Sequence, residues 1–237
     1  MMRIWDIHPG YLNRQSLLGE HRELHGMVSI FMHGKTGYSH HPETLRWVGY
    51  GWALQMRHRL LRCEMELRGY QDRSPVALDD NPGSWPAKYV DPPGLQLQIL
   101  RRKYIDKEAG RIPLPQNAQQ LWSQHKYSVL ARNPQIYHRI GLELAEEKIE
   151  MVELTLQVVE LLKSGPSKGG TRNAAQHMWG YVREAWTDEG EVENWSTKRL
   201  LLQTQKLAVK TCQPYLLAST ALSELLAWET EEDRGKF

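Results

Sequence analysis

Helical periodicity runs through almost the whole chain and constrains its fold more than any other feature. Residues 13–32 place Leu17, Leu24 and Val28 on one face, at intervals of seven and four residues, as an amphipathic helix does. Further helices are predicted at 42–69, 117–132, 134–163, 172–186, 198–212 and 214–228. No pair of segments alternates between apolar and polar residues as β-strands do. We therefore expect an all-α protein.

Proline, glycine and asparagine predict where these helices begin and break. Pro42 suits the first turn of a helix, and Asn133 with Pro134 predicts a cap followed by a first helical residue. Gly49 and Gly51 are expected to divide the second helix. Residues 72–96, rich in Pro, Asp and Gly, are expected to form a long irregular connection, and residues 164–170 a flexible break.

Charge is distributed unevenly along the chain. Of the 237 residues 41% are hydrophobic and 24% charged, as in ordinary globular proteins, and the net charge is +2. Residues 1–142 carry 19 Lys/Arg and 12 Asp/Glu, a net +7, whereas residues 143–237 carry 11 and 16, a net −5. We predict two domains, 1–142 and 143–237, with different partners.

Several classes of protein are excluded by what the sequence lacks. Cys63 and Cys212 are the only cysteines, so neither a disulfide framework nor a CxxC metal site is present. There is no phosphate loop, dinucleotide fingerprint or Gly-x-Ser-x-Gly motif. We interpret His40-His41 as a loop or cap pair and predict no metal site and no cofactor. Neither a membrane-spanning run nor an apolar leader is seen, and we expect a cytoplasmic protein without a membrane partner.

The N-terminal residues offer one route to chemistry. An α-amine has a reference pKa of about 7.7–8.0, and a neighbouring cation such as Arg3 lowers it further. A neutral amine can form a Schiff base with a sugar aldehyde carbon, and Glu23 could then carry protons. The alternative interpretation, that Arg3 and Glu23 are merely solvated, stays open on this evidence.

A run of motifs adds to that hypothesis. The chain opens Met2-Arg3-Ile4-Trp5 and continues His8-Pro9-Gly10-Tyr11-Leu12-Asn13-Arg14-Gln15. Further motifs are Glu20, Arg22-Glu23-Leu24, Thr36-Gly37-Tyr38, His41-Pro42, Arg68-Gly69-Tyr70 and Arg132-Asn133-Pro134. With these residues, the part from 2 to 142 resembles the pyrimidine-dimer DNA glycosylase/AP-lyase family, whose type member is a small phage endonuclease.

The resemblance implies a compact all-α domain that excises a damaged base, by family default a pyrimidine dimer. It implies a nucleophilic N-terminal α-amine, which forms an imine, and strand nicking by β-elimination without a metal or cofactor. The implied catalytic residues are Met2, Arg3, Arg22 and Glu23. The implied DNA-binding residues are Arg3, Arg14, Gln15, Arg22, Lys35 and Lys126, and the partner is double-stranded DNA with a damaged base or abasic site. A non-catalytic nucleic-acid-binding protein on the same scaffold is the alternative.

The chain departs from this family at three points. Ser16 replaces a histidine and Gly26 an arginine, which weakens two expected DNA contacts. Translation from Met1 would place the amine one residue too early, so we expect translation to begin at Met2. Glycine at position 19 fits the family site, because it lets a DNA backbone approach closely.

The C-terminal part resembles a different domain. Thr171-Arg172-Asn173, Gln176-His177 and Gly180-Tyr181 are similar to an uncharacterised helical domain appended to bacterial thiouracil desulfidases. The resemblance implies an RNA or protein partner for this part. Its net charge of −5 equally fits a helical buttress that completes the core.

Overall fold

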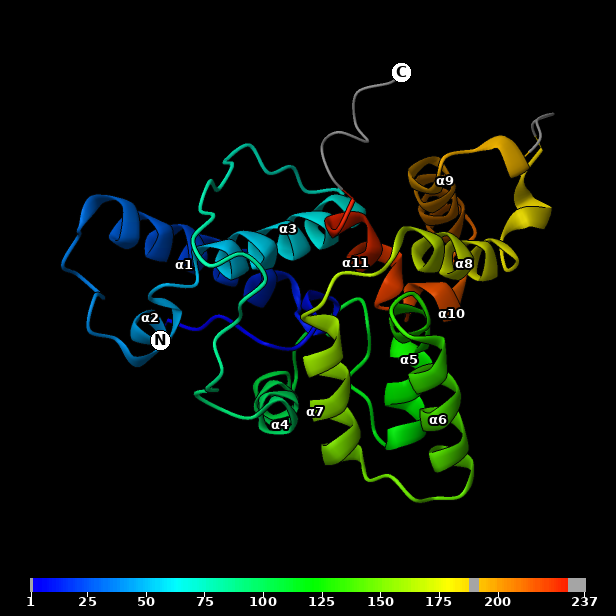
Figure 1. The fold of residues 1–237 in the computed structure, drawn as a ribbon, viewed down its shortest axis with the longest axis horizontal. Helices are drawn as coiled ribbons and strands as arrows, with labels where there is room; N and C mark the ends of the chain where they lie inside the picture. The colour runs from blue at the N-terminus through cyan, green and yellow to red at the C-terminus, as the bar shows by residue number, and fades with distance from the viewer. Residues whose placement is uncertain (1, 188–191, 230–237) are drawn as a thin grey trace. The chain divides into compact units, whose positions relative to one another are not determined.

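The computed structural model describes residues 2–187 and 192–229, and this part of the chain is helical without any strand. The prediction of an all-α protein is therefore confirmed. The chain divides into two compact units, Met1–Gly110 and Arg111–Phe237 (Figure 1). The predicted division at residue 142 lies inside a helix of the second unit. None of the described helices has the length and apolar character of a membrane span.

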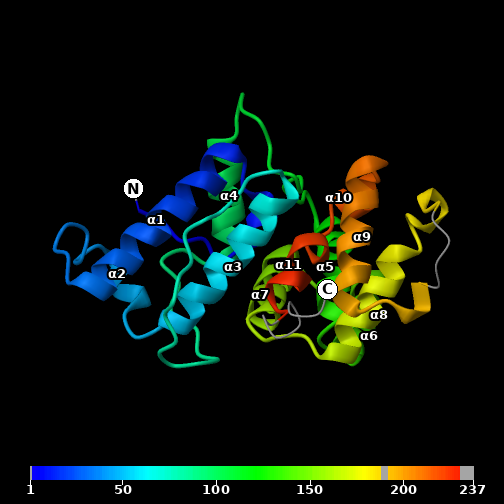
Figure 2. The same ribbon diagram turned by 90° about the horizontal axis from the view of Figure 1, so that it is seen from above.

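The first unit is organised around a pair of long helices. Its elements are the 3₁₀ helix η1 (Pro9–Tyr11), then α1 (Arg14–His33), α2 (Pro42–Trp47), α3 (Gly51–Leu67) and α4 (Pro93–Lys103). Helices α1 and α3 lie side by side (Figures 1 and 2). Leu17 and Leu24 of α1 and Leu54 and Leu61 of α3 are fully buried. Burial of such residues contributes about 1.5–3 kcal/mol per side chain and holds α1 in place.

Local capping interactions position the helix starts. The Asn13 side chain accepts a hydrogen bond from the backbone N–H of Ser16, at 2.9 Å, and caps α1. Pro42 begins α2, and His41 Nδ1 accepts from the N–H of Glu43 at 3.2 Å, so the predicted cap role of this histidine is confirmed. The predicted break at Gly49 is confirmed too, because its φ of +78° ends the helical path.

The expectation of an irregular segment through residue 96 was wrong at its end. Helix α4 begins at Pro93, within the run that resembles a connection. The buried residues of α4 are Pro93, Gln96, Leu97 and Leu100. This spacing is that of a helix, but two of the four residues, Pro93 and Gln96, are not apolar helix formers, so the apolar pattern alone did not reveal it.

The second unit consists of seven α-helices in its described part. They are α5 (Ala118–Leu130), α6 (Pro134–Ala145), α7 (Met151–Leu162), α8 (Lys168–Trp179), α9 (Thr197–Lys210), α10 (Pro214–Leu217) and α11 (Ala221–Ala227). Two short 3₁₀ helices, η2 (Arg183–Ala185) and η3 (Val192–Asn194), lie between α8 and α9. Helices α5, α6 and α7 enclose a core that includes Leu121, Ile140 and Val158 (Figure 1).

Three predicted helices of this unit have different limits in the structure. The helix expected over 134–163 ends at Ala145 and resumes at Met151, because Glu147 adopts a left-handed φ of +54°. The backbone N–H of Lys148 then donates to the carbonyl of Glu143 at 2.7 Å, which closes the first helix. The segment expected over 172–186 is helical from Lys168 to Trp179, and the one over 214–228 is interrupted after Leu217.

Candidate functional site

Residues 2–8 form an N-terminal segment that lies beside no strand in the described part of the chain, and side chains bind its backbone N–H groups instead. Glu23 Oε2 accepts from the N–H of Arg3 at 2.7 Å. Glu20 Oε1 accepts from the N–H of Trp5 at 3.0 Å. Because Glu20 and Glu23 are one turn apart on α1, the two carboxylates hold alternate residues of the segment against this helix.

Three arginines bind the carbonyl groups of the same N-terminal stretch. The bonds run from Arg57 to Ile7 at 2.8 Å, from Arg68 to Leu12 at 2.7 Å and from Arg46 to Ile4 at 3.3 Å. Each arginine also pairs with a carboxylate: Glu20, Glu64 and Glu43 respectively. A buried backbone needs a partner for each polar group, and here charged side chains supply them. The chain start is therefore fixed in the first unit.

The pair between Glu20 and Arg57 is the most deeply buried of these interactions. Arg57 Nε and Nη2 donate to the two carboxylate oxygens at 2.7 and 2.9 Å. Both side chains are almost fully excluded from solvent. Burial raises the pKa of the Glu20 carboxyl, and the charge of Arg57 opposes that shift. This geometry marks Glu20 as a positioning residue for the N-terminal segment.

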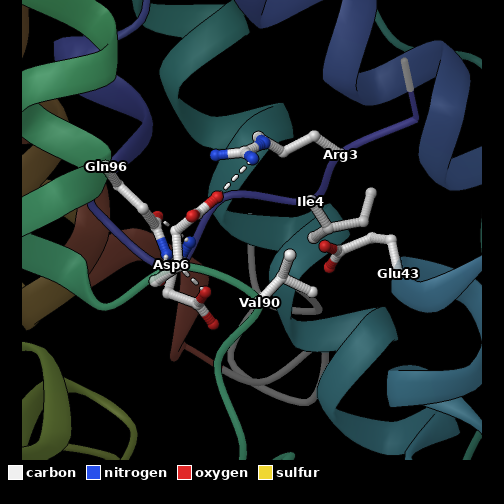
Figure 3. A pocket seen from close by; sticks show the side chains of 7 residues that line it. Arg3, Ile4, Asp6, Glu43, Val90 and Gln96 are labelled. Carbon is white, nitrogen blue, oxygen red and sulfur yellow. Dashed lines mark hydrogen bonds and ion pairs between the residues drawn. The ribbon is translucent and has the colours of Figure 1, made fainter.

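The Arg3 side chain contacts a carboxylate and an aromatic ring within the protein. Its Nη2 forms an ion pair with the carboxylate of Asp91, and its guanidinium lies 4.8 Å from the centre of the Trp5 ring. Figure 3 shows this arginine reaching over the group that contains Asp6 and Gln96. Both partners of the ion pair are about one-fifth exposed, so an incoming anion can compete for Arg3.

A second buried network lies beside the first. Arg46 Nη1 contacts both oxygens of Asp6, at 2.9 and 3.0 Å, and its Nη2 contacts Glu43 at 2.7 Å. Burial acts to lower the pKa of Arg46, but the two carboxylates outweigh this and raise it. Gln96 links Asp6 to Asp91, the partner of Arg3, because its Nε2 donates to the Asp6 carboxylate at 2.7 Å and to the Asp91 carbonyl at 2.8 Å. The guanidinium of Arg46 is therefore occupied by internal ion pairs.

A cavity of about 400 Å³ opens next to the Arg3–Glu23 hydrogen bond. Its walls come from the N-terminal segment, α1 and α4. They comprise Arg3, Trp5, Gln15, Ser16, Gly19, Glu20, Glu23, Ile99 and Lys103. A Cβ atom built on Gly19 would meet no atom within 4 Å, so packing does not require glycine at this position. The cavity therefore offers a carboxylate, an arginine and an open glycine surface to a ligand.

The structure brings some of the predicted site residues together. Arg3, Gln15 and Glu23 line the cavity. Met2, which precedes Arg3 in the chain, is buried, and its sulfur accepts a hydrogen bond from Thr44 Oγ1 at 3.2 Å. Met1 lies outside the described residues.

The other predicted basic residues do not line this cavity. Arg14 and Arg22 on α1 and Lys35 just after it are exposed, and none of them pairs with a carboxylate among the described residues. Lys126 belongs to α5 of the second unit. There its ammonium lies about 5 Å from the rings of Tyr127 and Tyr215.

Two residues of the site, Glu20 and Asp91, were missed as functional candidates. Glu20 was visible as a shared motif residue, but its role depends on Arg57, which is 37 positions away. Asp91 and Lys103 come from segments distant in sequence, and only the basic run 101–103 gave a local signal. Lys103 adds an exposed cation to the cavity wall.

The first unit also contains a group of residues that could hold a metal ion. His21, His25, His58 and Asp72, called the histidine cluster below, place one ligand atom each within 4.8 Å of one another. Burial lowers the pKa of His58 to about 4 and lowers that of His21 as well. The prediction of no metal site overlooked the i, i+4 spacing of His21 and His25 on α1, which was readable from the sequence.

Comparisons with known families agree with the two resemblances. Residues 2–78 match the family described as pyrimidine dimer DNA glycosylase. Residues 126–224 match a family described as a protein of unknown function. No curated protein matches the chain. No solved structure matches it either. The first match covers α1 and both glutamates that hold the N-terminal segment.

Proposed function

We propose that the first unit is a DNA repair glycosylase with AP-lyase activity, which uses the α-amine of Met2 as its nucleophile. One observation carries this proposal: the N-terminal segment is fixed with the Arg3 nitrogen 2.7 Å from the Glu23 carboxylate, at the wall of an open cavity. The Met2 nitrogen is three covalent bonds upstream, so it lies within about 7 Å of that carboxylate.

The first chemical step forms an imine. The amine lone pair attacks C1′ of the damaged nucleotide, and the bond from C1′ to the base breaks with its electrons leaving on the base. Opening of the sugar ring at O4′ then gives the imine. The two protons of the amine pass to the departing base and to O4′, with Glu23 as the carrier nearest to the amine.

The second step breaks the DNA strand. The imine makes the C2′ proton acidic, and the Glu23 carboxylate removes it. The electron pair forms a C2′–C3′ double bond while the C3′–O bond breaks and its electrons leave with the phosphate. Water then hydrolyses the imine and frees the enzyme. No metal or cofactor is required by this balance of atoms.

The basic residues of α1 and α4 bind DNA in this proposal. Arg22 and Lys103 contact phosphates, and Arg3 exchanges Asp91 for a phosphate and stabilises the developing charge. Gln15 and Gly19 allow the backbone to approach α1. The target nucleotide must leave the base stack so that C1′ can reach the amine.

Borohydride trapping tests the proposal directly. An imine-forming enzyme becomes covalently linked to abasic-site DNA on reduction, whereas a non-catalytic nucleic-acid-binding protein does not. Glu23→Gln keeps an oxygen that can accept from the Arg3 N–H but removes the base, and should slow nicking about 10²–10⁴-fold without loss of DNA binding. Glu66→Gln, an exposed glutamate of α3, is the matched control and should nick normally. Undiminished nicking by Glu23→Gln would refute the role of Glu23.

The start of the protein decides where the nucleophile lies. A Met1 retained on the chain converts the Met2 nitrogen into an amide, which has no nucleophilic lone pair. We propose that translation begins at Met2, and the intact mass of the natively expressed protein measures this. An active lyase that keeps Met1 would overturn the assignment of the nucleophile.

Lys126 is proposed as a nucleic-acid contact in the second unit. Its ammonium and three tyrosines form one partly exposed group, in which Tyr181 stacks on Tyr215 with ring centres 5.0 Å apart. Cations beside aromatic rings suit single-stranded bases, which stack on such rings. Lys126→Ala should weaken nucleic-acid binding, whereas Lys198→Ala on α9 should not. Equal binding by the two variants would remove Lys126 from the interface.

A further inference from the structure

The histidine cluster joins three separate parts of the first unit. His21 and His25 lie one turn apart on α1, His58 lies on α3, and Asp72 lies in the segment that follows α3. The side chains of His58 and Asp72 are each only 4% exposed, and that of His21 is 16% exposed. Three imidazoles and a carboxylate therefore converge at a mostly buried point between two helices and a loop.

The shortest separations within the cluster are close to those between neighbouring donor atoms around a small ion, and the four donor atoms all lie within 4.8 Å of one another. Zinc binds imidazole nitrogen at about 2.0–2.1 Å and carboxylate oxygen at about 2.0–2.2 Å. Tetrahedral geometry then separates neighbouring donor atoms by roughly 3.3–3.5 Å. The Nε2 atoms of His21 and His25 are 3.3 Å apart, and Asp72 Oδ1 is 3.3 Å from His21 Nε2. His58 Nε2 is 3.2 Å from Asp72 Oδ2.

Hydrogen bonding inside the protein accounts for only part of this arrangement, because Asp72 Oδ1 lies against His21 Nε2 but another ligand atom of the cluster is left without a partner in the part of the chain that the structure describes. His58 is 3% exposed, and its Nε2 has no hydrogen-bond partner among the described residues, although Asp72 Oδ2 lies 3.2 Å away. His21 and His25 face each other through nitrogens that can share only one proton.

We infer that His21, His25, His58 and Asp72 form a structural Zn²⁺ site that joins α1 to α3 and to the segment after α3. Imidazole with carboxylate in a tetrahedral set suits zinc among the divalent ions. Four protein ligands leave no open position for a reacting water.

The site lies away from the proposed chemistry. On a helix, successive residues turn by about 100°, so Glu23 points about 160° away from both His21 and His25. The ion would hold the back of α1 while the opposite face carries the cavity. The inference therefore goes beyond the proposed function and does not depend on it.

Metal binding by the untagged full chain tests the inference. The protein is freed of metal with a chelator and then titrated with Zn²⁺ against a colorimetric competitor, and uptake of one equivalent is expected. Co²⁺ in its place should give the intense visible absorption of a tetrahedral centre. The midpoint of thermal unfolding should rise with Zn²⁺. A wild-type protein that takes up no Zn²⁺ under these conditions overturns the inference.

Variants locate the ion. His25→Gln and Asp72→Asn should each weaken Zn²⁺ binding at least tenfold and abolish the Co²⁺ spectrum, whereas His33→Gln, an exposed histidine at the end of α1, should bind as wild type. Circular dichroism confirms that each variant is folded. Should a cluster variant fail to fold, the wild-type stoichiometry and Co²⁺ spectrum decide the matter. Unchanged binding by a folded Asp72→Asn refutes the assigned ligands. Borohydride trapping with the chelated protein separates this outcome from failure of the lyase proposal.

Discussion

Replacing Gly19 with alanine should make the protein more stable and a poorer DNA binder. Gly19 lies inside α1, where glycine costs about 0.5–1 kcal/mol relative to alanine because the unfolded chain gains flexibility. A Cβ atom at Gly19 meets nothing within 4 Å, so no clash offsets this gain. The free energy of unfolding should therefore rise by about 0.5–1 kcal/mol.

The same methyl group occupies the surface to which DNA must come close. Gly19 lines the cavity together with Gln15 and Glu23. Pushing the DNA backbone away from one charge-assisted hydrogen bond costs about 1.5–3 kcal/mol, which corresponds to roughly 10- to 150-fold weaker binding. Gains in stability and losses in affinity from one substitution identify a glycine that serves ligand approach rather than packing.

Gly26→Ala is the matched control for this experiment. Gly26 is also within α1 and also has open space around it, but it does not line the cavity. Urea unfolding should show the same stabilisation for both variants, and fluorescence anisotropy with an abasic duplex should show weaker binding only for Gly19→Ala. Equal affinities of the two variants would refute the assignment of this α1 face to DNA.

Three further predictions address the groups around the site. Glu20→Ala should lower the free energy of unfolding by about 3–5 kcal/mol, because Arg57 would remain buried without its carboxylate partner. Urea unfolding measures this change, and a loss below about 1 kcal/mol would contradict the prediction. Asp91→Asn should tighten binding to an abasic duplex, because Arg3 no longer has an internal counter-charge; unchanged affinity in anisotropy titrations would mean that Arg3 does not contact DNA. Burial lowers the pKa of His125 to about 3 in the folded protein. As the pH falls below about 6.5, this histidine therefore becomes protonated in the unfolded chain but stays neutral in the folded one. Stability should fall between pH 6.5 and 3 by up to about 1.4 kcal/mol per pH unit from this group, and urea unfolding of His125→Gln, if folded, should show a shallower slope.

Helix starts were predictable from the sequence because their causes are local. Asn13, Pro42 and Asn133 act on backbone groups within three residues of themselves, so a short window of sequence contains the whole interaction. The break after Ala145 depends instead on a left-handed Glu147, a conformation that no residue type demands. Periodicity alone therefore joined α6 to α7.

The candidate site was predictable only where one element contains it. Glu23 and Gln15 share α1, and their common face follows from helical spacing. The hydrogen bonds that fix the N-terminal segment join residues 15 to 90 positions apart, such as Gln96 with Asp6. The histidine cluster has the same character, since only the pair on α1 has a local signature.

Available charge, rather than net charge, decides where nucleic acid can bind. Residues 1–110 carry 15 Lys/Arg and 12 Asp/Glu, a net +3, so much of the +7 assigned to residues 1–142 belongs to the second unit. There Arg132 pairs with Glu224, with both side chains only 2% exposed.

In the first unit Arg46 and Arg57 likewise bind internal carboxylates and backbone carbonyls. Such arginines add to the sum but release no counterions when a phosphate approaches, because they are already neutralised. Exposed cations remain on α1 (Arg14 and Arg22), just after it (Lys35), on α4 (Arg101, Arg102 and Lys103) and in loops of the first unit (Arg73, Lys88 and Lys107). Two of these elements, α1 and α4, also supply walls of the Glu23 cavity, so the electrostatic attraction for DNA and the proposed nucleophile belong to the same part of the fold.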